Sequence, residues 1–280
     1  MSEPNALKRA ADAPAAKQEG WWETVKVIVE ALIIALVVRT LLFQPFNIPS
    51  GSLIPTLLVG DYLFVSKYSY GYSHFALPGF LDLAPAATPG RLFASQPKRG
   101  DIIVFKLPRD GETDYIKRLI GLPGDKIEMR DNRLYINDQL VPREPAAPYP
   151  YHYEDDPLTG APMYREVLHY YETLPDNDMR PGAVRHEIIE IVGDNNVSKY
   201  SANAGPYIVP PGDYFFMGDD RDNSSDSRVP PDKGGVGYVP FDNLVGRAEV
   251  IFFSIDGAPA WEFWRWPWTV RWSRMFHAVH

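Results

Sequence analysis

Two serines flank a single glycine in the stretch NIPSGSLIP, where prolines bracket Ser50, Gly51 and Ser52. Gly and Ser are common turn residues and proline fixes φ, so this stretch predicts a tight turn that leads into a strand. The same rigid turn would also hold an exposed serine nucleophile. A hydrolase additionally needs a base and hydrogen-bond donors for an oxyanion, so the choice between the two interpretations depends on finding a base.

The six histidines provide no clear base, because none lies in a polar motif with Ser and Asp. The stretch HEIIE resembles a zinc-protease motif, but Glu190 stands where the second histidine is required. GDDRDNSSDSR is rich in Asp, but counting from Asp220 places Ser225 and Pro231 at the sixth and twelfth positions, where a calcium loop needs Gly and Glu. SQPK, SDS and KGG echo the motifs of penicillin-binding enzymes only imperfectly, and Pro97 opposes the helix that this chemistry requires. We therefore predict no metal ion, no cofactor and no histidine base.

Lysine remains as a candidate base. Lys117 lies in DYIKRLIGLPGD, which has the apolar content of a strand. If its side chain points inward, burial lowers the lysine pKa from about 10.4 to near 8, at a cost of about 3 kcal/mol. A neutral amine then accepts a proton from a serine hydroxyl and returns it to a leaving amine. A solvated lysine on the face of a strand is the alternative that the residues alone leave open.

Composition limits the class of protein that must position these residues. The 280 residues carry a net charge of −8, which argues against nucleic acid as a partner. The absence of cysteine excludes cysteine proteases, disulfide frameworks and cysteine-ligated zinc. Twenty-seven prolines and 21 glycines indicate many turns between short strands.

Alternating and β-branched stretches predict the strands. They are DYLFVSKYSYG (61–71), RGDIIVFKLP (99–108), a meander over 114–144, HEIIEIV (186–192), YFFMGDD (214–220) and NLVGRAEVIFF (243–253). Turns are predicted at Gly121–Gly124, Asp131–Asn132 and Asn137–Asp138. We expect a long loop at 75–98, and loops with one strand at 143–185.

The N-terminal region predicts a membrane anchor. Residues 1–20 are polar and read as a disordered tail, and residues 21–43 are apolar enough for one transmembrane helix. A cleaved signal peptide and an amphipathic surface helix are the alternatives, although FQPFNIPS is a poor cleavage site. Basic residues gather before the apolar stretch, which predicts a cytoplasmic N-terminus with everything after it on the other side of the membrane.

Four stretches follow this predicted span in order: NIPSGSLIPTLLVGDYLFV, RGDIIVFK, DYIKRLIGLPGD and GDDRDNSSDSR. Together they resemble the sequence boxes of the bacterial type I signal peptidases (leader peptidases), membrane-bound serine proteases of the Ser–Lys class. The resemblance favours the catalytic interpretation of Ser52 and Lys117 over the structural one. It implies a mainly β fold, with an antiparallel signal-peptidase-like sheet and an inserted β-rich subdomain behind one N-terminal transmembrane helix.

The resemblance also implies roles for individual residues. Ser52 matches the nucleophile and Lys117 the general base, while the Ser52 N–H and the Ser50 hydroxyl match the oxyanion hole. Ser224 matches a serine that orients the lysine amine, and Gly218 leaves room beside the lysine. Asp226 and Arg228 match a supporting pair.

Shallow apolar pockets in this family accept small residues one and three positions before the cut, and substrates bind as an added strand. The positions that match the pocket lining are Phe46, Ile48, Leu53, Leu57, Val104, Tyr115 and Ile116. Two positions depart from the family pattern, since Leu53 stands where Met is common and Asp220 where Asn is usual. The Asp220 carboxylate would raise the pKa of the lysine. We also find one span, whereas the best-known members have two.

The implied domains are a tail at 1–20, an anchor at 21–43 and an extracytoplasmic catalytic domain at 44–255, with its insertion at about 127–214. The last segment, 256–280, carries five Trp and three Arg and is expected either to lie on the membrane surface or to pack on the domain.

The implied function is removal of signal peptides after Ala-x-Ala at the outer face of the bacterial cytoplasmic membrane. The implied partners are preprotein signal peptides and the lipid bilayer, near the secretion translocon, with no nucleic acid. A specialised Ser–Lys peptidase with one or few substrates, such as a pilin, stays open. A self-cleaving repressor would need a helix-turn-helix and no span, and a non-enzymatic membrane-tethered binding domain would make Ser52 and Lys117 dispensable.

Overall fold

The computed structural model describes residues 21–76, 90–155, 162–181, 184–191, 202–257 and 261–279. The chain forms two compact units, residues 1–39 and residues 40–280. In the first unit, the α-helix α1 (Trp21–Val37) begins at the paired tryptophans. A π-helical turn, η1 (Val38–Leu42), continues the chain after it.

Residues 21–43 are the segment in which a transmembrane helix is predicted. Across the part of the chain that the structure describes, no helix has both the length and the apolar content needed to cross a membrane. Helix α1 is 17 residues long, and its Lys26 and Glu30 form an i,i+4 ion pair. The predicted transmembrane helix is therefore not confirmed.

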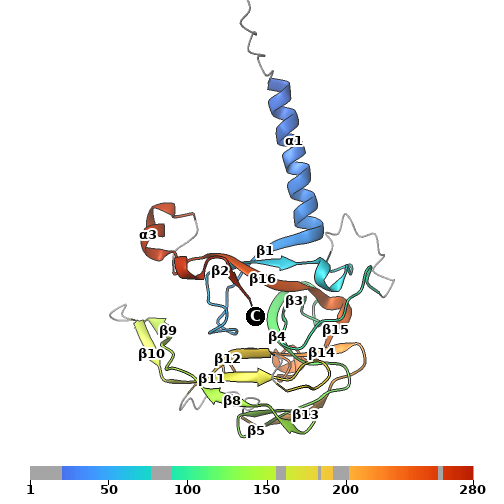
Figure 1. The fold of residues 1–280 in the computed structure, drawn as a ribbon, viewed down its shortest axis with the longest axis vertical. Helices are drawn as coiled ribbons and strands as arrows, with labels where there is room; N and C mark the ends of the chain where they lie inside the picture. The colour runs from blue at the N-terminus through green and yellow to red at the C-terminus, as the bar shows by residue number, and fades with distance from the viewer. Residues whose placement is uncertain are drawn as a thin grey trace, which may run out of the picture. The chain divides into compact units, whose positions relative to one another are not determined.

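An antiparallel sheet forms the frame of the second unit (Figure 1). Its order is β1-β2-β16-β3-β4-β14-β15, and β17 pairs with β16. The bounds are β1 (Phe43–Asn47), β2 (Asp61–Ser66), β3 (Ile102–Lys106), β4 (Asp114–Gly121), β14 (Asp213–Met217), β15 (Val239–Pro240), β16 (Leu244–Ser254) and β17 (His277–Ala278). Each of the long strands predicted from alternation in these regions is present, which confirms a mainly β, antiparallel fold.

Three smaller sheets come from the chain between β4 and β14. They are the four-stranded sheet β13 (Ala204–Ile208), β5 (Lys126–Arg130), β6 (Arg133–Ile136), β7 (Gln139–Leu140); the three-stranded sheet β12 (Val184–Ile191), β11 (Val167–Leu174), β8 (Arg143–Pro145); and the pair β10 (Pro162–Arg165), β9 (Tyr151–Asp155). The predicted turn residues Asp131–Asn132 and Asn137–Asp138 all have positive φ, as the tightest hairpins require.

The prediction of loops with a single strand at 143–185 is wrong. This region holds β8, β9, β10 and β11, together with the first residues of β12. Its many prolines and aspartates suggested loops, yet β11 pairs with β12 over eight residues and also with β8. Tyrosine favours strands, and here the pairing partners outweigh the turn-forming composition. Of the loop predicted at 75–98, residues 77–89 lie outside the described part of the chain.

Short helices complete the second unit. They are η2 (Tyr68–Tyr70), η4 (Pro231–Lys233), η5 (Phe241–Asn243), η6 (Phe263–Arg265), α3 (Trp266–Thr269) and η7 (Trp272–Arg274). The last three belong to the Trp-rich C-terminal segment. This segment packs on the domain: Arg274 donates to the buried Asp61, and β17 pairs with β16.

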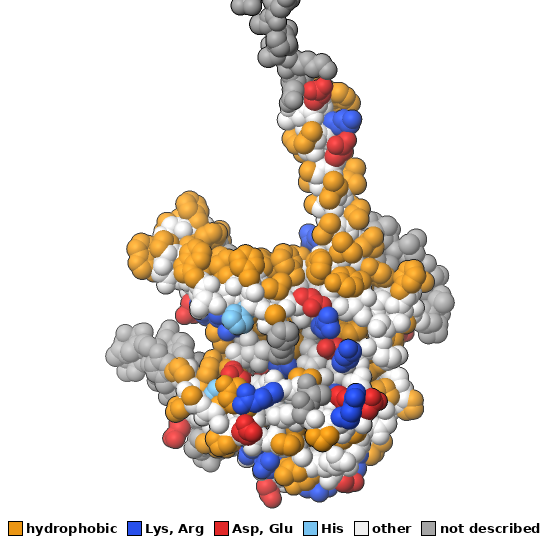
Figure 2. All heavy atoms as spheres, in the orientation of Figure 1, with side chains coloured by type: hydrophobic (Ala, Val, Ile, Leu, Met, Phe, Trp, Pro, Cys, Tyr) orange, Lys and Arg blue, Asp and Glu red, His pale blue; other side chains and the backbone are white. Residues whose placement is uncertain are grey.

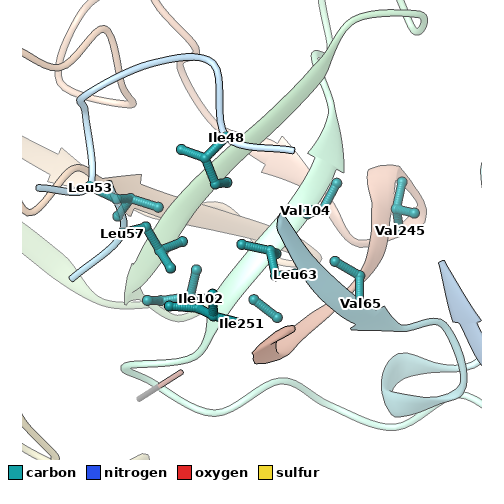
Figure 3. Packing of buried hydrophobic residues seen from close by; sticks show 10 residues of the cluster. Ile48, Leu53, Leu57, Leu63, Val65, Ile102, Val104, Val245 and Ile251 are labelled. Atoms are coloured by element: carbon teal, nitrogen blue, oxygen red, sulfur yellow. The ribbon is translucent and has the colours of Figure 1, made fainter. Parts of the chain in front are cut away.

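One hydrophobic cluster lies directly under the Ser50–Ser52 turn. Figure 3 shows Ile48, Leu53 and Leu57 of this segment packed with Val104 of β3 and Leu63 of β2. Because these side chains are at most 3% exposed, burial of their apolar surface fixes the turn against the sheet.

Candidate active site

Ser52 and Lys117 meet in the folded chain although 65 residues separate them. Lys117 lies on β4 and donates a hydrogen bond of 2.5 Å from Nζ to Ser52 Oγ. Both residues are buried, with exposures of 6% for Ser52 and 4% for Lys117. The Lys117 side chain thus points inward, and the alternative of a solvated lysine on the strand face is wrong.

The surroundings of Lys117 favour its neutral form. Burial lowers the pKa of Lys117 from 10.5 to about 8, while Asp226, Asp219 and Asp220 raise it and Arg228 lowers it further. Burial prevails because an ammonium loses its hydration in the protein interior, whereas three carboxylates recover only part of that loss. With this pKa, about a tenth of Lys117 is neutral and able to accept a proton at pH 7, and about half at pH 8.

The turn around Ser52 is held from below. The Ile54 N–H donates to the Gly51 carbonyl, and the Leu57 N–H donates to the Leu53 carbonyl. Ser50 is exposed at the rim of the turn, whereas Ser52 is buried at the lysine. The two serines thus occupy different environments, one facing solvent and one facing Lys117.

Gly218 lies against the backbone of Ser52. A Cβ at this position would lie 2.4 Å from the Ser52 carbonyl oxygen and 2.4 Å from Ser224 Oγ. The space predicted beside the lysine is therefore occupied by Ser52 and Ser224. The absence of a side chain at Gly218 allows this close approach, since real Cβ atoms do not come within 3 Å of such atoms.

Asp226 and Arg228 form the predicted pair. Arg228 donates from Nε and from a terminal nitrogen to Asp226, at 3.0 and 2.8 Å. The Gly218 N–H also donates to Asp226, at 2.9 Å. Burial alone would raise the pKa of Asp226, but the Arg228 guanidinium holds it below its usual value. Asp226 is therefore a buried anion that fixes Gly218 and attracts the Lys117 ammonium.

Ser224 forms no hydrogen bond to the lysine amine in the described structure, and its orienting role stays a prediction. Within the described residues, its buried Oγ has no hydrogen-bond partner. It lies near enough to Asp226 to lower the pKa of that carboxyl slightly. Ser224 therefore lies in the site, beside Asp226 and Gly218, without a bond to the amine.

Sequence reasoning missed a second buried ion pair behind the site. Arg118 donates twice to Asp219 at 2.8 Å, and Thr56 Oγ1 donates to the same carboxylate at 2.6 Å. These side chains connect β4, the loop after β14 and the segment after Ser52. The sequence indicated part of this ion pair, because side chains alternate along a strand and Arg118 therefore points to the face of β4 opposite Lys117.

The seven predicted substrate-binding residues fall into two groups. Six of them lie in or against the hydrophobic cluster under the turn: Phe46, Ile48, Leu53, Leu57, Val104 and Ile116. Tyr115 packs against a neighbouring cluster, and its ring centroid lies 5.5 Å from Lys117 Nζ. Only Phe46, Tyr115 and Ile116 keep appreciable exposed surface, while the other four are buried.

Comparison with known proteins decides the family. The family model "Signal peptidase, peptidase S26" matches residues 21–253 of this chain. The chain belongs to this family. It is accordingly a serine endopeptidase, and the resemblance carried by the four sequence boxes is confirmed.

Curated relatives agree with this assignment. The chain is 44% identical over 223 residues to "Signal peptidase I" of Rickettsia typhi, covering 80% of this chain and 76% of that one. It is 41% identical over 239 residues to "Signal peptidase I" of Rickettsia akari, covering 85% and 80% of the two chains. A solved signal peptidase I from Enterococcus faecalis is 25% identical, with a TM-score of 0.28, over 55% of this chain and 97% of that one. At this TM-score, the solved structure supports no conclusion about the present fold.

Proposed function

We propose that this chain removes signal peptides from exported preproteins, with Ser52 as nucleophile and Lys117 as general base. The observation that carries the proposal is the buried 2.5 Å contact between Lys117 Nζ and Ser52 Oγ. A lysine needs no third residue to fix a tautomer, so two side chains suffice for proton transfer.

In the proposed acylation step, neutral Lys117 accepts the hydroxyl proton of Ser52. The Ser52 oxygen then forms a bond to the scissile carbonyl carbon, and the electron pair of the C=O bond moves to oxygen. When this pair returns, the C–N bond breaks, and the Lys117 ammonium gives its proton to the leaving amine. The products of this step are the shortened polypeptide and an ester on Ser52.

The oxyanion is stabilised by hydrogen-bond donors of the Ser50–Ser52 turn in this proposal. The Ser50 hydroxyl and the Ser52 N–H belong to the residues on either side of Gly51. The turn that carries them is fixed by the buried Leu53 and Leu57. Such preorganised donors stabilise charge without reorganising during the reaction. Deacylation then repeats the proton transfers with water: Lys117 deprotonates it, and the released serine oxygen regains the proton.

The substrate is proposed to bind as a strand along β4. Strand β14 pairs with β4 only at Arg118, Leu119 and Gly121, so within the described residues β14 gives no partner to residues 114–117 of β4. An extended peptide satisfies exposed backbone groups of this kind. It would pass Tyr115 and Ile116 and bring its carbonyl carbon to Ser52.

The selectivity for small residues follows from this arrangement. Phe46, Tyr115 and Ile116 provide the accessible apolar surface, and the buried side chains beneath them leave little depth. A shallow apolar pocket accepts Ala and excludes larger side chains by steric overlap.

We further propose that the enzyme is anchored in the bacterial cytoplasmic membrane by residues 21–43, with the N-terminus in the cytoplasm and the catalytic unit outside. No residue of α1 is buried, and its exposed apolar side chains include Val27, Leu32 and Ile34. A lipid environment would cover this surface. An anchor would also place the enzyme beside the apolar segments of its substrates and near the secretion translocon.

The C-terminal segment supplies a second proposed lipid contact. Figure 2 shows hydrophobic side chains gathered around α3, where Trp261, Trp264 and Trp268 are 69%, 55% and 83% exposed. Trp favours the membrane–water interface. In a chain with Trp21 and Trp22 replaced by Phe, brominated lipids should quench the remaining Trp fluorescence, and unchanged emission would contradict this contact.

The function is tested with the detergent-solubilised full chain and a panel of preproteins that carry Ala-x-Ala sites. We expect cleavage after the second Ala, identified by the mass of the products, and loss of cleavage when that Ala is replaced by Leu. Failure to cut any member of the panel would overturn the proposal. Cleavage of a single member would favour the specialised peptidase.

A further inference from the structure

A tyrosine from the inserted region contacts the loop after β14, and this loop is hydrogen-bonded to the backbone of Ser52. Tyr151, on β9, is 4% exposed, and its hydroxyl donates to Asp220 Oδ2 at 2.8 Å. Asn223 of the same loop donates to the Tyr151 oxygen at 3.1 Å. The Asp220 N–H in turn donates to the Ser52 carbonyl at 3.2 Å. These bonds connect an inserted strand to the backbone of the proposed nucleophile in two steps.

Strand β12 of the inserted region also forms backbone hydrogen bonds with the residues on both sides of Asp220. The Ile189 N–H of β12 donates to the Asp219 carbonyl, and the Arg221 N–H donates to the Ile189 carbonyl, both at 3.0 Å. Arg221 forms a buried bidentate ion pair with Glu172 of β11. The loop beside Lys117 is therefore an extra, short pairing partner of β12.

We propose that Tyr151 and Asp220 are positioning residues for the Ser52–Lys117 pair, through which the inserted β sheets fix the backbone of the nucleophile. The proposal rests on the proposed function, since Ser52 must be the nucleophile for its position to affect the rate.

Geometry explains why a small displacement here affects the rate. The Ser52 carbonyl oxygen is enclosed by the Asp220 N–H and by Gly218, at whose position even a methyl group would clash. If Asp220 moves, the carbonyl of Ser52 loses its hydrogen-bond donor. The backbone of Ser52 can then rotate and displace the hydroxyl of its side chain. A misplacement of about 1 Å in a catalytic group lowers a rate by up to about 100-fold.

Asp220 also contributes charge. Burial raises the pKa of Asp220 to about 6, against hydrogen bonds from Tyr151 and Asn223, and Asp222 raises it further. Its carboxylate is thus ionised above that pH and, with Asp226 and Asp219, raises the pKa of Lys117 against burial and Arg228.

The test compares Tyr151→Phe with a matched control, Tyr171→Phe, in the detergent-solubilised full chain. Tyr171 lies in the same inserted region but packs over Arg185 rather than beside Asp220. We expect Tyr151→Phe to lower kcat about 3- to 10-fold with KM unchanged, and Tyr171→Phe to leave both unchanged. Equal kcat values for the two variants would overturn the proposal, as would a fall in kcat explained by an equal fall in folded fraction.

Two further variants test whether Tyr151 acts through Asp220. In an Asp220→Ala background, adding Tyr151→Phe should change kcat less than about 2-fold, because the bond that it removes is already absent. Multiplicative losses would overturn the coupling. Asp220→Asn keeps an acceptor and removes the charge, so half-maximal kcat/KM should appear at a lower pH, an effect that a merely structural role would not produce. An unchanged profile would overturn the electrostatic part.

Ser52→Ala in the same assay separates the two levels of the argument. If Ser52→Ala is inactive while Tyr151→Phe equals wild type, only the positioning role fails. If Ser52→Ala retains activity, the proposed function fails and the positioning role fails with it.

Discussion

A methyl group added at Gly218 tests the packing of the site most sharply. The new Cβ would lie 2.4 Å from the Ser52 carbonyl oxygen, 2.4 Å from Ser224 Oγ and 2.5 Å from Ser224 Cβ. Ordinary contacts begin at about 3.4 Å, so the Ser224 side chain and the Ser52 carbonyl must both move by about 1 Å, or the backbone at position 218 must shift away from them. Rotation about the Cα–Cβ bond of Ser224 moves its Oγ but leaves its Cβ in place, and the Ser52 carbonyl belongs to the backbone of the nucleophile.

We expect Gly218→Ala to lower kcat by about 100-fold, which is typical of a catalytic group misplaced by about 1 Å. Overpacking should also lower the free energy of unfolding by about 1–3 kcal/mol. Rates of preprotein cleavage at saturating substrate and denaturant unfolding measure the two effects on the same sample.

Gly121→Ala is the matched control. Its added Cβ would lie 2.9 Å from side-chain atoms of Ile127 and Phe215, inside the hydrophobic core and away from the dyad. This variant should lose stability and keep kcat per folded molecule. The reasoning is refuted if Gly218→Ala retains wild-type kcat, or if both variants lose kcat in proportion to their loss of stability.

Three other predictions follow from the same geometry. With the pKa of Lys117 at about 8, kcat/KM should rise with pH and reach half its maximum near pH 8. At pH 7 this pKa leaves about 9% of the lysine neutral, about 300-fold more than a pKa of 10.5 would leave. A profile with half-maximal activity above pH 10 would contradict the lowered pKa. Ser50→Ala should lower kcat by about 100-fold with little change in unfolding, and a wild-type kcat would remove its hydroxyl from the oxyanion hole. Arg274→Ala removes a charged donor, at 2.6 Å, from the fully buried Asp61 and should lower the free energy of unfolding in urea by about 1–3 kcal/mol. The milder Arg274→Lys should retain part of that free energy. An unchanged urea midpoint for Arg274→Ala would show that the C-terminal segment is not anchored at Asp61.

Local patterns sufficed to predict much of the fold. Alternation located β2, β3, β4, β14 and β16, because a sheet with one buried face imposes a period of two. Asn and Asp in pairs located two hairpin turns, because these residues tolerate positive φ. Both signals act over a few neighbouring residues, and so they can be read directly from the chain.

The missed ion pairs depend on residues that are distant in sequence. Glu172 and Arg221 pair across 49 residues, and Arg118 and Asp219 across 101. No local pattern indicates such a pair, since each member alone resembles a solvent-exposed charge. The strands in 143–185 were missed for a different reason: β11 is stabilised by pairing with β8 and with β12, the next strand along the chain, which the turn-forming composition of the region does not indicate.

The candidate site was partly accessible from sequence. The Ser50–Ser52 turn and Lys117 were identified by residue type and by resemblance, but their contact required the fold. The predicted pocket residues proved mostly buried, because the same apolar positions that would face a substrate also build the cluster under the turn.

Burial of Lys117 should lower the free energy of unfolding of the folded chain wherever the lysine is protonated. Because its pKa is lowered in the folded chain, the unfolded chain binds more protons between about pH 8 and 10.5, and stability rises with pH across that range. At pH 7 the buried ammonium lowers the free energy of unfolding by up to about 3 kcal/mol. Lys117→Met is therefore expected to be inactive and at least as stable as wild type.

The most direct test of the Ser52–Lys117 dyad is the rate of preprotein cleavage by Ser52→Ala and Lys117→Met beside two controls. The controls are Ser73→Ala and Lys67→Met, which alter another buried serine and another buried lysine. The dyad predicts that the first two variants lose cleavage while remaining folded, and that both controls keep the wild-type kcat per folded molecule. Cleavage by folded Ser52→Ala or Lys117→Met at the wild-type rate would contradict it.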